Sequence, residues 1–286
     1  MKCSGFEASP VLVYGDGARH ANERSDVEAT RAVARELLGD RAEYYFSDSN
    51  QGLSRSVIRG VGEVLERFGN AIVVEDDLDL APEFISYMNS ALERYADTPE
   101  VYQVSGYQFS VPEFALRQHA LFLPIAVSWG WATWKRAWKS FDSDAVGWEH
   151  LLRDRVLRYE FNLGGVYGYA TMLLRQMTGM RDSWAIRWYW AVFREKGVVL
   201  FPPVSLVRNT GFDGTGTHGR GVLRNFNSPQ QNGKAVNILM PDDVRIHAED
   251  FAVVRRALWQ MNGRWFGAVV DRLRWYITVL RASKWV

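Results

Sequence analysis

The stretch Ala71-Ile-Val-Val-Glu-Asp-Asp77 joins an apolar, mostly β-branched run directly to three acids. A continuous run of this kind is typical of a strand that is covered on both faces of a sheet. Three carboxylates at the end of such a strand repel one another and lose solvation, so we expect a positive charge to balance them. A divalent cation would do so, because Mg²⁺ takes one or two carboxylates together with substrate phosphates. A solvated acidic turn, or carboxylates drawn to a helix dipole, would explain the triplet without a metal.

On both sides of this strand the sequence alternates between strand patterns and helix patterns. Apolar runs predict strands at 11–14, 44–46, 71–74 and 101–104, and helical spacing predicts helices at 27–38, at 54–68 and after Pro82. This alternation predicts an α/β fold with a mainly parallel central sheet flanked by helices. In such sheets ligands bind beyond the carboxyl ends of the strands, which is where the acidic triplet lies.

The overall composition argues against several classes of protein. The chain has 286 residues, with 34 Lys and Arg against 33 Asp and Glu, and its formal net charge is +1. This balance argues against a protein that binds nucleic acid mainly through the phosphates of the nucleic acid. The single Cys3 cannot form an intramolecular disulfide, and the sequence shows neither a secretion signal nor an apolar stretch of about 20 residues. We therefore expect a cytoplasmic protein.

Tryptophan is distributed unevenly along the chain. None of the 12 tryptophans precedes Trp129, and most of them fall within 129–190. Aromatic faces stack on sugar rings and an indole N–H can donate to a hydroxyl, so one interpretation is that the second half of the chain binds sugars. The other interpretation is that these tryptophans form the core of a second lobe.

Three motifs together resemble a known family. Asn50-Gln-Gly-Leu53, the acidic segment 72–78 and Trp129-Gly-Trp-Ala-Thr-Trp134 look like motifs of bacterial GT-A type glycosyltransferases, similar to the family that includes N-acetylglucosaminyltransferase I. The resemblance runs from about Val11 to Gly219. It implies a GT-A fold and an inverting, metal-dependent transfer of a sugar from a nucleotide-diphosphate sugar, with a UDP-sugar favoured. The hydroxyl acceptor would be a glycan or a lipid-linked glycan in surface polysaccharide synthesis.

The resemblance also implies a division of the chain. Residues 1–109 would form the nucleotide-sugar-binding half, 110–240 the acceptor-binding and catalytic half of the same domain, and 241–286 a C-terminal helical tail. Members of the family usually begin with a further strand and helix, which we expect this sheet to lack, because the sequence starts at what resembles their second strand. Two alternatives stay open: a catalytically inactive nucleotide-sugar-binding protein, and a nucleotidyltransferase with a similar core.

Site residues follow from the matched motifs. The resemblance implies that Asp77, with Asp76, holds Mn²⁺ or Mg²⁺ on the donor diphosphate, and that Glu75 supports them. Asp16, at the end of its strand, would contact the nucleotide base, and Asn50 would also contact the donor.

The turn that contains Gly130 would form part of the sugar or acceptor pocket, and we assign Trp131 to the nucleotide-sugar site.

A second acid lies among aromatic residues. Asp182 stands in Met180-Arg-Asp-Ser-Trp-Ala-Ile-Arg-Trp188, where partial desolvation would raise the pKa of its carboxyl and make it a better base near neutrality. The resemblance implies that Asp182 is the catalytic base that deprotonates the acceptor hydroxyl. The alternative is that Asp182 caps the helix that follows it.

A glycine-rich segment forms the third cluster. Asn209-Thr-Gly-Phe-Asp-Gly-Thr-Gly-Thr-His218-Gly could fold closely over phosphates, and a neutral imidazole can contact a diphosphate oxygen. This stretch resembles the lid that closes over the donor in related enzymes, with His218 near the diphosphate. A surface turn without a ligand is the alternative.

The C-terminal segment 266–286 combines apolar residues at helical spacing with intervening arginines. This pattern suits a basic amphipathic helix on an anionic membrane surface, which would place the protein at the inner face of the membrane. A terminal helix packed on its own domain is the alternative.

Overall fold

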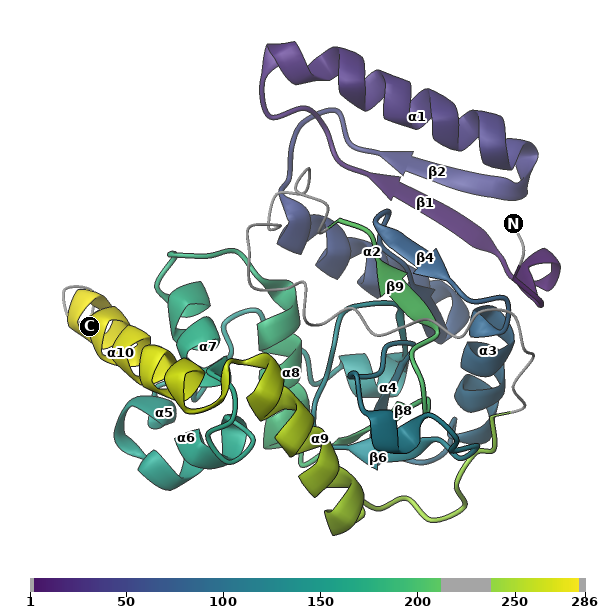
Figure 1. Ribbon diagram of the computed structural model, residues 1–286. Coiled ribbons are helices and arrows are strands. Elements are labelled where there is room, and N and C mark those ends of the chain that lie inside the picture. Colours follow the sequence, from purple (N-terminus) through teal and green to yellow (C-terminus); the bar gives the residue numbers. More distant parts are fainter. Residues whose placement is uncertain (1–2, 212–237, 283–286) are drawn as a thin grey trace.

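Three sheets organise the computed structural model, which describes residues 3–211 and 238–282 (Figure 1). The five-stranded sheet has the order β3-β7-β5-β8-β6. Its strands are β3 (Asn70–Val73), β5 (Val101–Ser105), β6 (Leu121–Leu123), β7 (Trp131–Trp134) and β8 (Val198–Phe201). Strands from the predicted front half and from the predicted second half therefore share one sheet.

The prediction of a mainly parallel central sheet is wrong. Only β5 and β8 pair in parallel in the five-stranded sheet, whereas β3–β7, β5–β7 and β6–β8 are antiparallel. Two of these antiparallel pairings arise from β7, which lies between β3 and β5 and runs against both of them, and the third arises from the edge strand β6. We expected a turn in this Trp-rich segment, but all four residues of β7 are buried. The fold is mixed α/β.

A smaller α/β unit precedes the five-stranded sheet. The strands β1 (Val11–Gly15) and β2 (Ala42–Phe46) pair in parallel and are joined by α1 (Arg24–Leu38). The Tyr44 hydroxyl of β2 donates to two carbonyls at the end of α1, and Tyr14 of β1 lies under Gly60 of α2 (Leu53–Phe68) on the other side. The strands at 11–14 and 44–46 and the helices at 27–38 and 54–68 are thus confirmed.

The β1–β2 pair does not join the five-stranded sheet. Among the described strands, β1 pairs only with β2 and β3 pairs only with β7. The helix α2 contacts both β1 and β3 and so holds the two sheets together. All five residues of β1 are only half-buried, whereas β5 and β8 are almost entirely buried.

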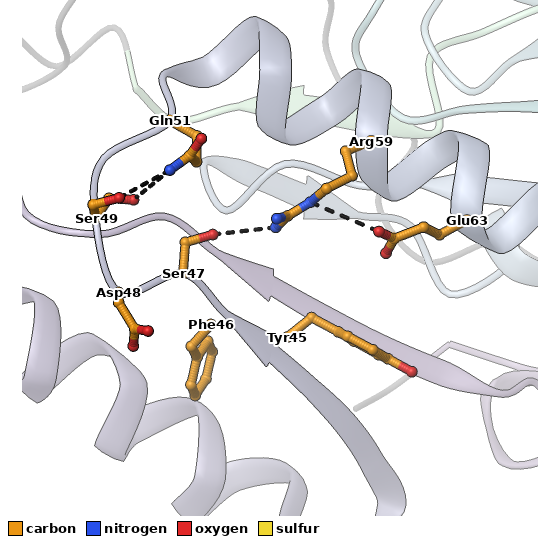
Figure 2. A pocket seen from close by; sticks show the side chains of 8 residues that line it. All are labelled: Tyr45, Phe46, Ser47, Asp48, Ser49, Gln51, Arg59 and Glu63. Atoms are coloured by element: carbon orange, nitrogen blue, oxygen red, sulfur yellow. Dashed lines mark hydrogen bonds and ion pairs between the residues drawn. The ribbon is translucent and has the colours of Figure 1, made fainter.

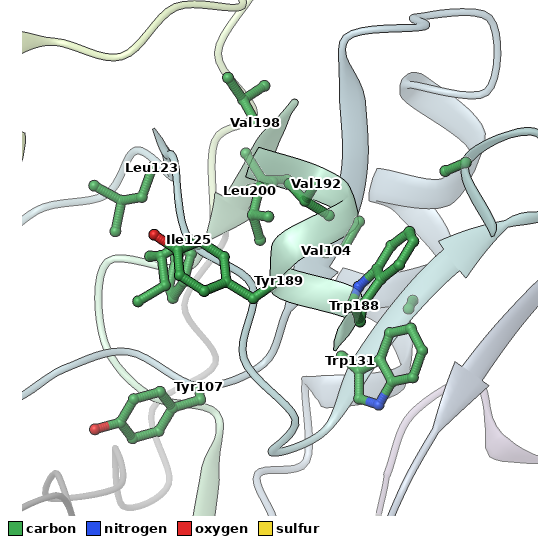
Figure 3. Close-up of a cluster of buried hydrophobic side chains, with 14 of the residues drawn as sticks. Val104, Tyr107, Leu123, Ile125, Trp131, Trp188, Tyr189, Val192, Val198 and Leu200 are labelled. Atoms are coloured by element: carbon green, nitrogen blue, oxygen red, sulfur yellow. The ribbon is translucent and has the colours of Figure 1, made fainter. Parts of the chain in front are cut away.

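The core of the protein lies around the five-stranded sheet (Figure 3). Three helices pack on this sheet or on α2: α3 (Phe84–Arg94), α4 (Lys135–Trp138) and α8 (Trp184–Arg194). Half of the tryptophans are buried within this core: Trp131, Trp134, Trp148, Trp184, Trp188 and Trp190. For these six residues the burial supports the interpretation that they form a core.

The remaining helices come before and after α8 in the chain, and of these α7 packs directly on α8. They are α5 (His150–Arg153), α6 (Arg155–Phe161), α7 (Tyr169–Met177), α9 (Ala248–Met261) and α10 (Arg264–Ala282). Figure 1 shows α10 lying along α7 at the edge of the molecule. Within the described ranges, no helix combines the length and the apolar character needed to cross a bilayer.

A two-stranded antiparallel sheet completes the fold. It consists of β4 (Leu78–Leu80), which follows the acidic triplet, and β9 (Val207–Asn209). Gly130, just before β7, lies against this region with a φ of +57°, and a Cβ placed there would stand 2.8 Å from Val207 Cγ1 and 2.9 Å from Phe84 Cε2.

Replacing Gly130 by alanine is therefore expected to destabilise the fold by about 2–4 kcal/mol, because left-handed backbone strain adds to overpacking. The control is Gly62→Ala in α2, where a new Cβ meets nothing within 4 Å. That change is expected to stabilise the protein by about 0.5–1 kcal/mol. Denaturant unfolding measures the free energy of unfolding of both variants. Changes of the same sign would contradict the argument that Gly130 is strained and closely packed whereas Gly62 is not.

Candidate functional site

The acidic triplet forms a turn between β3 and β4. Glu75 and Asp77 are partly buried and Asp76 is exposed. Burial, followed by the charges of Asp77 and Asp76, raises the pKa of Glu75 to about 7. Asp77 Oδ1 is buried and has no hydrogen-bond partner within the described part of the chain. The turn thus brings three acids together, and the described residues leave one buried oxygen of Asp77 without a hydrogen-bond partner.

The turn is fastened to a segment more than a hundred residues away. Because Leu78 pairs with Asn209 in the β4–β9 sheet, the buried Asn209 side chain reaches Asp77 and donates to its Oδ2 at 3.1 Å. The Thr210 amide and hydroxyl both donate to the Asp77 carbonyl, at 2.7 and 2.9 Å. The start of the glycine-rich segment therefore lies on the acidic turn, while His218 lies outside the described residues.

The acidic turn fits a cation that arrives with its own ligand. In the ranges 3–211 and 238–282, no three His, Cys, Asp or Glu side chains are grouped so as to hold a metal ion. Mg²⁺ needs only one or two protein carboxylates when phosphates supply the other oxygens. The unpartnered Asp77 Oδ1 and the exposed Asp76 are the oxygens that such an ion would use.

Asp16 and Asn50 lie together at the carboxyl end of β1. Asp16 accepts hydrogen bonds from the amides of Gly17, Gln51 and Gly52, each at 2.8 Å, and from Asn50 Nδ2 at 3.0 Å. Both carboxylate oxygens are thus engaged by the protein itself. In this structure Asp16 fixes the loop that leads into α2.

Asp182 faces that same loop. Its Oδ2 lies 3.8 Å from the position that a Cβ on Gly52 would occupy, and its Oδ1 lies 3.9 Å from the Arg187 guanidinium. The Asp182 side chain is 59% exposed, so the desolvation that we expected from its aromatic neighbours is small. Ser183, rather than Asp182, occupies the cap position of α8. Asp182 is therefore an accessible acid beside the loop held by Asp16.

A buried tryptophan stack links Asp182 with the acidic turn. Trp131 pairs with Val73 at the end of β3, and its ring stacks on Trp184 with centroids 5.1 Å apart. Trp131 is fully buried, so its ring packs within the protein core. Its indole Nε1 is buried without a described hydrogen-bond partner.

A polar hollow of about 410 Å³ opens beside the loop held by Asp16 (Figure 2). Arg59 of α2 points into it, donates to the Ser47 hydroxyl at 3.1 Å and lies 3.9 Å from Glu63. The hollow is lined by Tyr45, Phe46, Ser47, Asp48, Ser49, Gln51, Arg59 and Glu63. Ser47 and Arg59 were not among the residues predicted from the sequence. The polar run that follows β2 is a signal for Ser47, whereas Arg59 lies on the helix α2, where an arginine gives no such signal.

Comparison with known proteins gives no family. No protein-family model matches the chain, and no curated protein matches it.

Proposed function

We propose that this protein is a metal-dependent glycosyltransferase of the GT-A type that uses a nucleotide-diphosphate sugar, with a UDP-sugar favoured. The observation that carries the proposal is the acidic turn, where Asp77 presents a buried carboxylate oxygen with no described partner beside two further acids. A cation bound to a diphosphate supplies the charge that this turn needs and brings the remaining ligands with it. The motif resemblance supports the same assignment.

In this proposal Asp77 and Asp76 hold the divalent cation, which when bound neutralises charge on the leaving diphosphate. Asp182 takes the proton of the acceptor hydroxyl while that oxygen forms its bond to the anomeric carbon. The bond from the anomeric carbon to the diphosphate oxygen breaks, and its electron pair leaves with the diphosphate. Because attack and departure occur on opposite faces of the sugar, the transfer inverts the anomeric centre.

The surroundings of Asp182 favour this role. It is exposed to solvent and therefore reachable by an acceptor. The Trp131–Trp184 stack packs α8, which begins two residues after Asp182, on β7, the strand that pairs with the one ending in the acidic turn. The loop held by Asp16 runs beside it and borders the polar hollow, which offers Arg59 and hydroxyl groups to a nucleotide. The hollow lies at the carboxyl end of β2, where α/β units bind ligands.

An inactive nucleotide-sugar-binding protein is the second candidate, and the separation of the β1–β2 pair from the five-stranded sheet favours it. A panel of nucleotide sugars with Mn²⁺ distinguishes the two candidates. The enzyme releases nucleoside diphosphate from its donor, and a chelator abolishes the release. Heat of binding by calorimetry without release would identify the binding protein, and the absence of both would contradict both candidates.

A further inference from the structure

The C-terminal helix α10 has one face packed on the protein. Gly267, Thr278 and Ala282 are buried on this face, and α10 contacts α7 and α9. Asp271 also points inward, because its carboxylate accepts a hydrogen bond from Asn262 Nδ2 at 2.9 Å. Through this face α10 packs on the rest of the protein, as expected for a terminal helix that packs on its own domain.

The opposite face of α10 is apolar and exposed. Its side chains repeat at helical spacing and, at 100° per residue, cover about one third of the helix circumference. Two of them, Trp265 and Leu280, are each 70% exposed. The full stripe consists of Trp265, Phe266, Val269, Leu273, Tyr276, Ile277 and Leu280. A single exposed leucine is ordinary, but an unbroken stripe of this size indicates a surface that is covered in use.

Arginines border this stripe on both sides. Arg272 lies along one border, and Arg274 and Arg281 lie along the other, all three exposed. The only acid in the described helix is the inward-facing Asp271. The exposed face of α10 therefore carries positive charge, most of it at Arg272 and Arg281, because Arg274 lies 3.6 Å from the Asp271 carboxylate and is partly balanced by it.

We propose that α10 docks this protein on an anionic lipid surface. The apolar stripe enters the boundary between headgroups and acyl chains, where Trp265 and Tyr276 suit the mixed polarity, and the flanking arginines bind lipid phosphates. A helix of 19 residues is about 28 Å long and lies in the plane of the bilayer. A second copy of the chain is a poorer occupant, because a two-fold pairing of this face would bring the arginines of both copies together.

The test compares flotation of the full chain with vesicles of pure phosphatidylcholine and with vesicles of equimolar phosphatidylcholine and phosphatidylglycerol. The protein is expected to bind the anionic vesicles at least about tenfold more tightly, because each arginine near an anionic surface adds to the affinity. The double change Leu273→Gln and Leu280→Gln is expected to lower that binding by about tenfold or more. Both leucines are exposed, so the fold is retained. The matched control is Leu37→Gln on α1, where Leu37 is 77% exposed, and it should bind as the unchanged protein does.

A charge variant tests the second half of the proposal. Arg272→Gln is expected to weaken binding to the anionic vesicles by roughly fivefold and to leave binding to phosphatidylcholine unchanged, and Arg24→Gln on α1 serves as its control. Equal binding of the unchanged protein to both vesicles, or full binding by the leucine variant, would overturn the proposal. Sedimentation without lipid gives the last test: if the unchanged protein is a dimer and the leucine variant is a monomer, a second copy of the chain covers this face and the proposal is overturned.

Discussion

Asparagine in place of Asp77 is expected to lower metal-dependent donor binding and sugar transfer by at least about 100-fold. The variant keeps the shape of the side chain but removes its charge, and the unpartnered Oδ1 loses its value as a cation ligand. Titration calorimetry of a nucleoside diphosphate with Mn²⁺ measures the binding, and release of nucleoside diphosphate measures the transfer.

The fold of this variant should persist. The Asn209 side chain can still donate to a carbonyl oxygen at position 77, and the two Thr210 bonds go to the main chain, which the change leaves intact. Removing one of three neighbouring carboxylates also lowers the repulsion within the turn. A loss of donor binding with an unchanged free energy of unfolding would therefore be a loss of the site itself.

Asp79→Asn is the matched control for this change. Asp79 lies two residues further on, is half exposed and forms a 2.5 Å ion pair with Arg208. Because this ion pair lies at the surface, it contributes little to the stability of the protein. Its replacement should leave donor binding within about twofold. If Asp77→Asn behaves like Asp79→Asn, the acidic turn does not hold a cation and the proposed function fails with it.

Local periodicity explains why much of the fold could be predicted from the sequence. The helices α1 and α2 have apolar residues at regular helical spacing, and β1 and β3 are short apolar runs that end at polar residues. The sheet order could not be predicted in this way, because it depends on pairing between distant segments. The pairing of Trp131 with Val73 and with Ser105 places β7 between two front-half strands, and no local pattern in a Trp-rich segment indicates that.

The candidate site was predictable in its charges and not in its contacts. The acids of the turn are visible in the sequence because they directly follow an apolar strand. The contact of Asn209 with Asp77 depends on the β4–β9 pairing, which joins residues more than a hundred positions apart. The clamp formed by Asp16 uses backbone amides, which every residue has, so the side chains give no sign of it. Likewise, the burial of Trp131 follows from its place in the sheet and not from its spacing.

Asparagine in place of Asp182 is expected to lower sugar transfer by about 100-fold to 10,000-fold while nucleotide-sugar binding stays within about twofold. The amide cannot accept the proton of the acceptor hydroxyl, but it preserves the shape of a side chain that is 59% exposed and only loosely paired with Arg187. Calorimetry with the donor and Mn²⁺ measures the binding, and product formation with an acceptor measures the transfer. This separation of binding from transfer distinguishes Asp182 from Asp77, whose replacement should remove both.

The control for Asp182→Asn has to account for Arg187. Burial lowers the pKa of this arginine, whereas the charges of Asp182 and Asp144 raise it, so either acid could act merely by supporting a buried cation. Asp144→Asn removes the other supporting charge and leaves the carboxylate beside Gly52 in place. If Asp182 is the base, only the Asp182 variant loses transfer, because in the proposed mechanism Asp182, and not Asp144, takes the proton of the acceptor hydroxyl. Equal losses in the two variants would show that the charge around Arg187 matters instead, and near-normal transfer by Asp182→Asn would exclude Asp182 as the base.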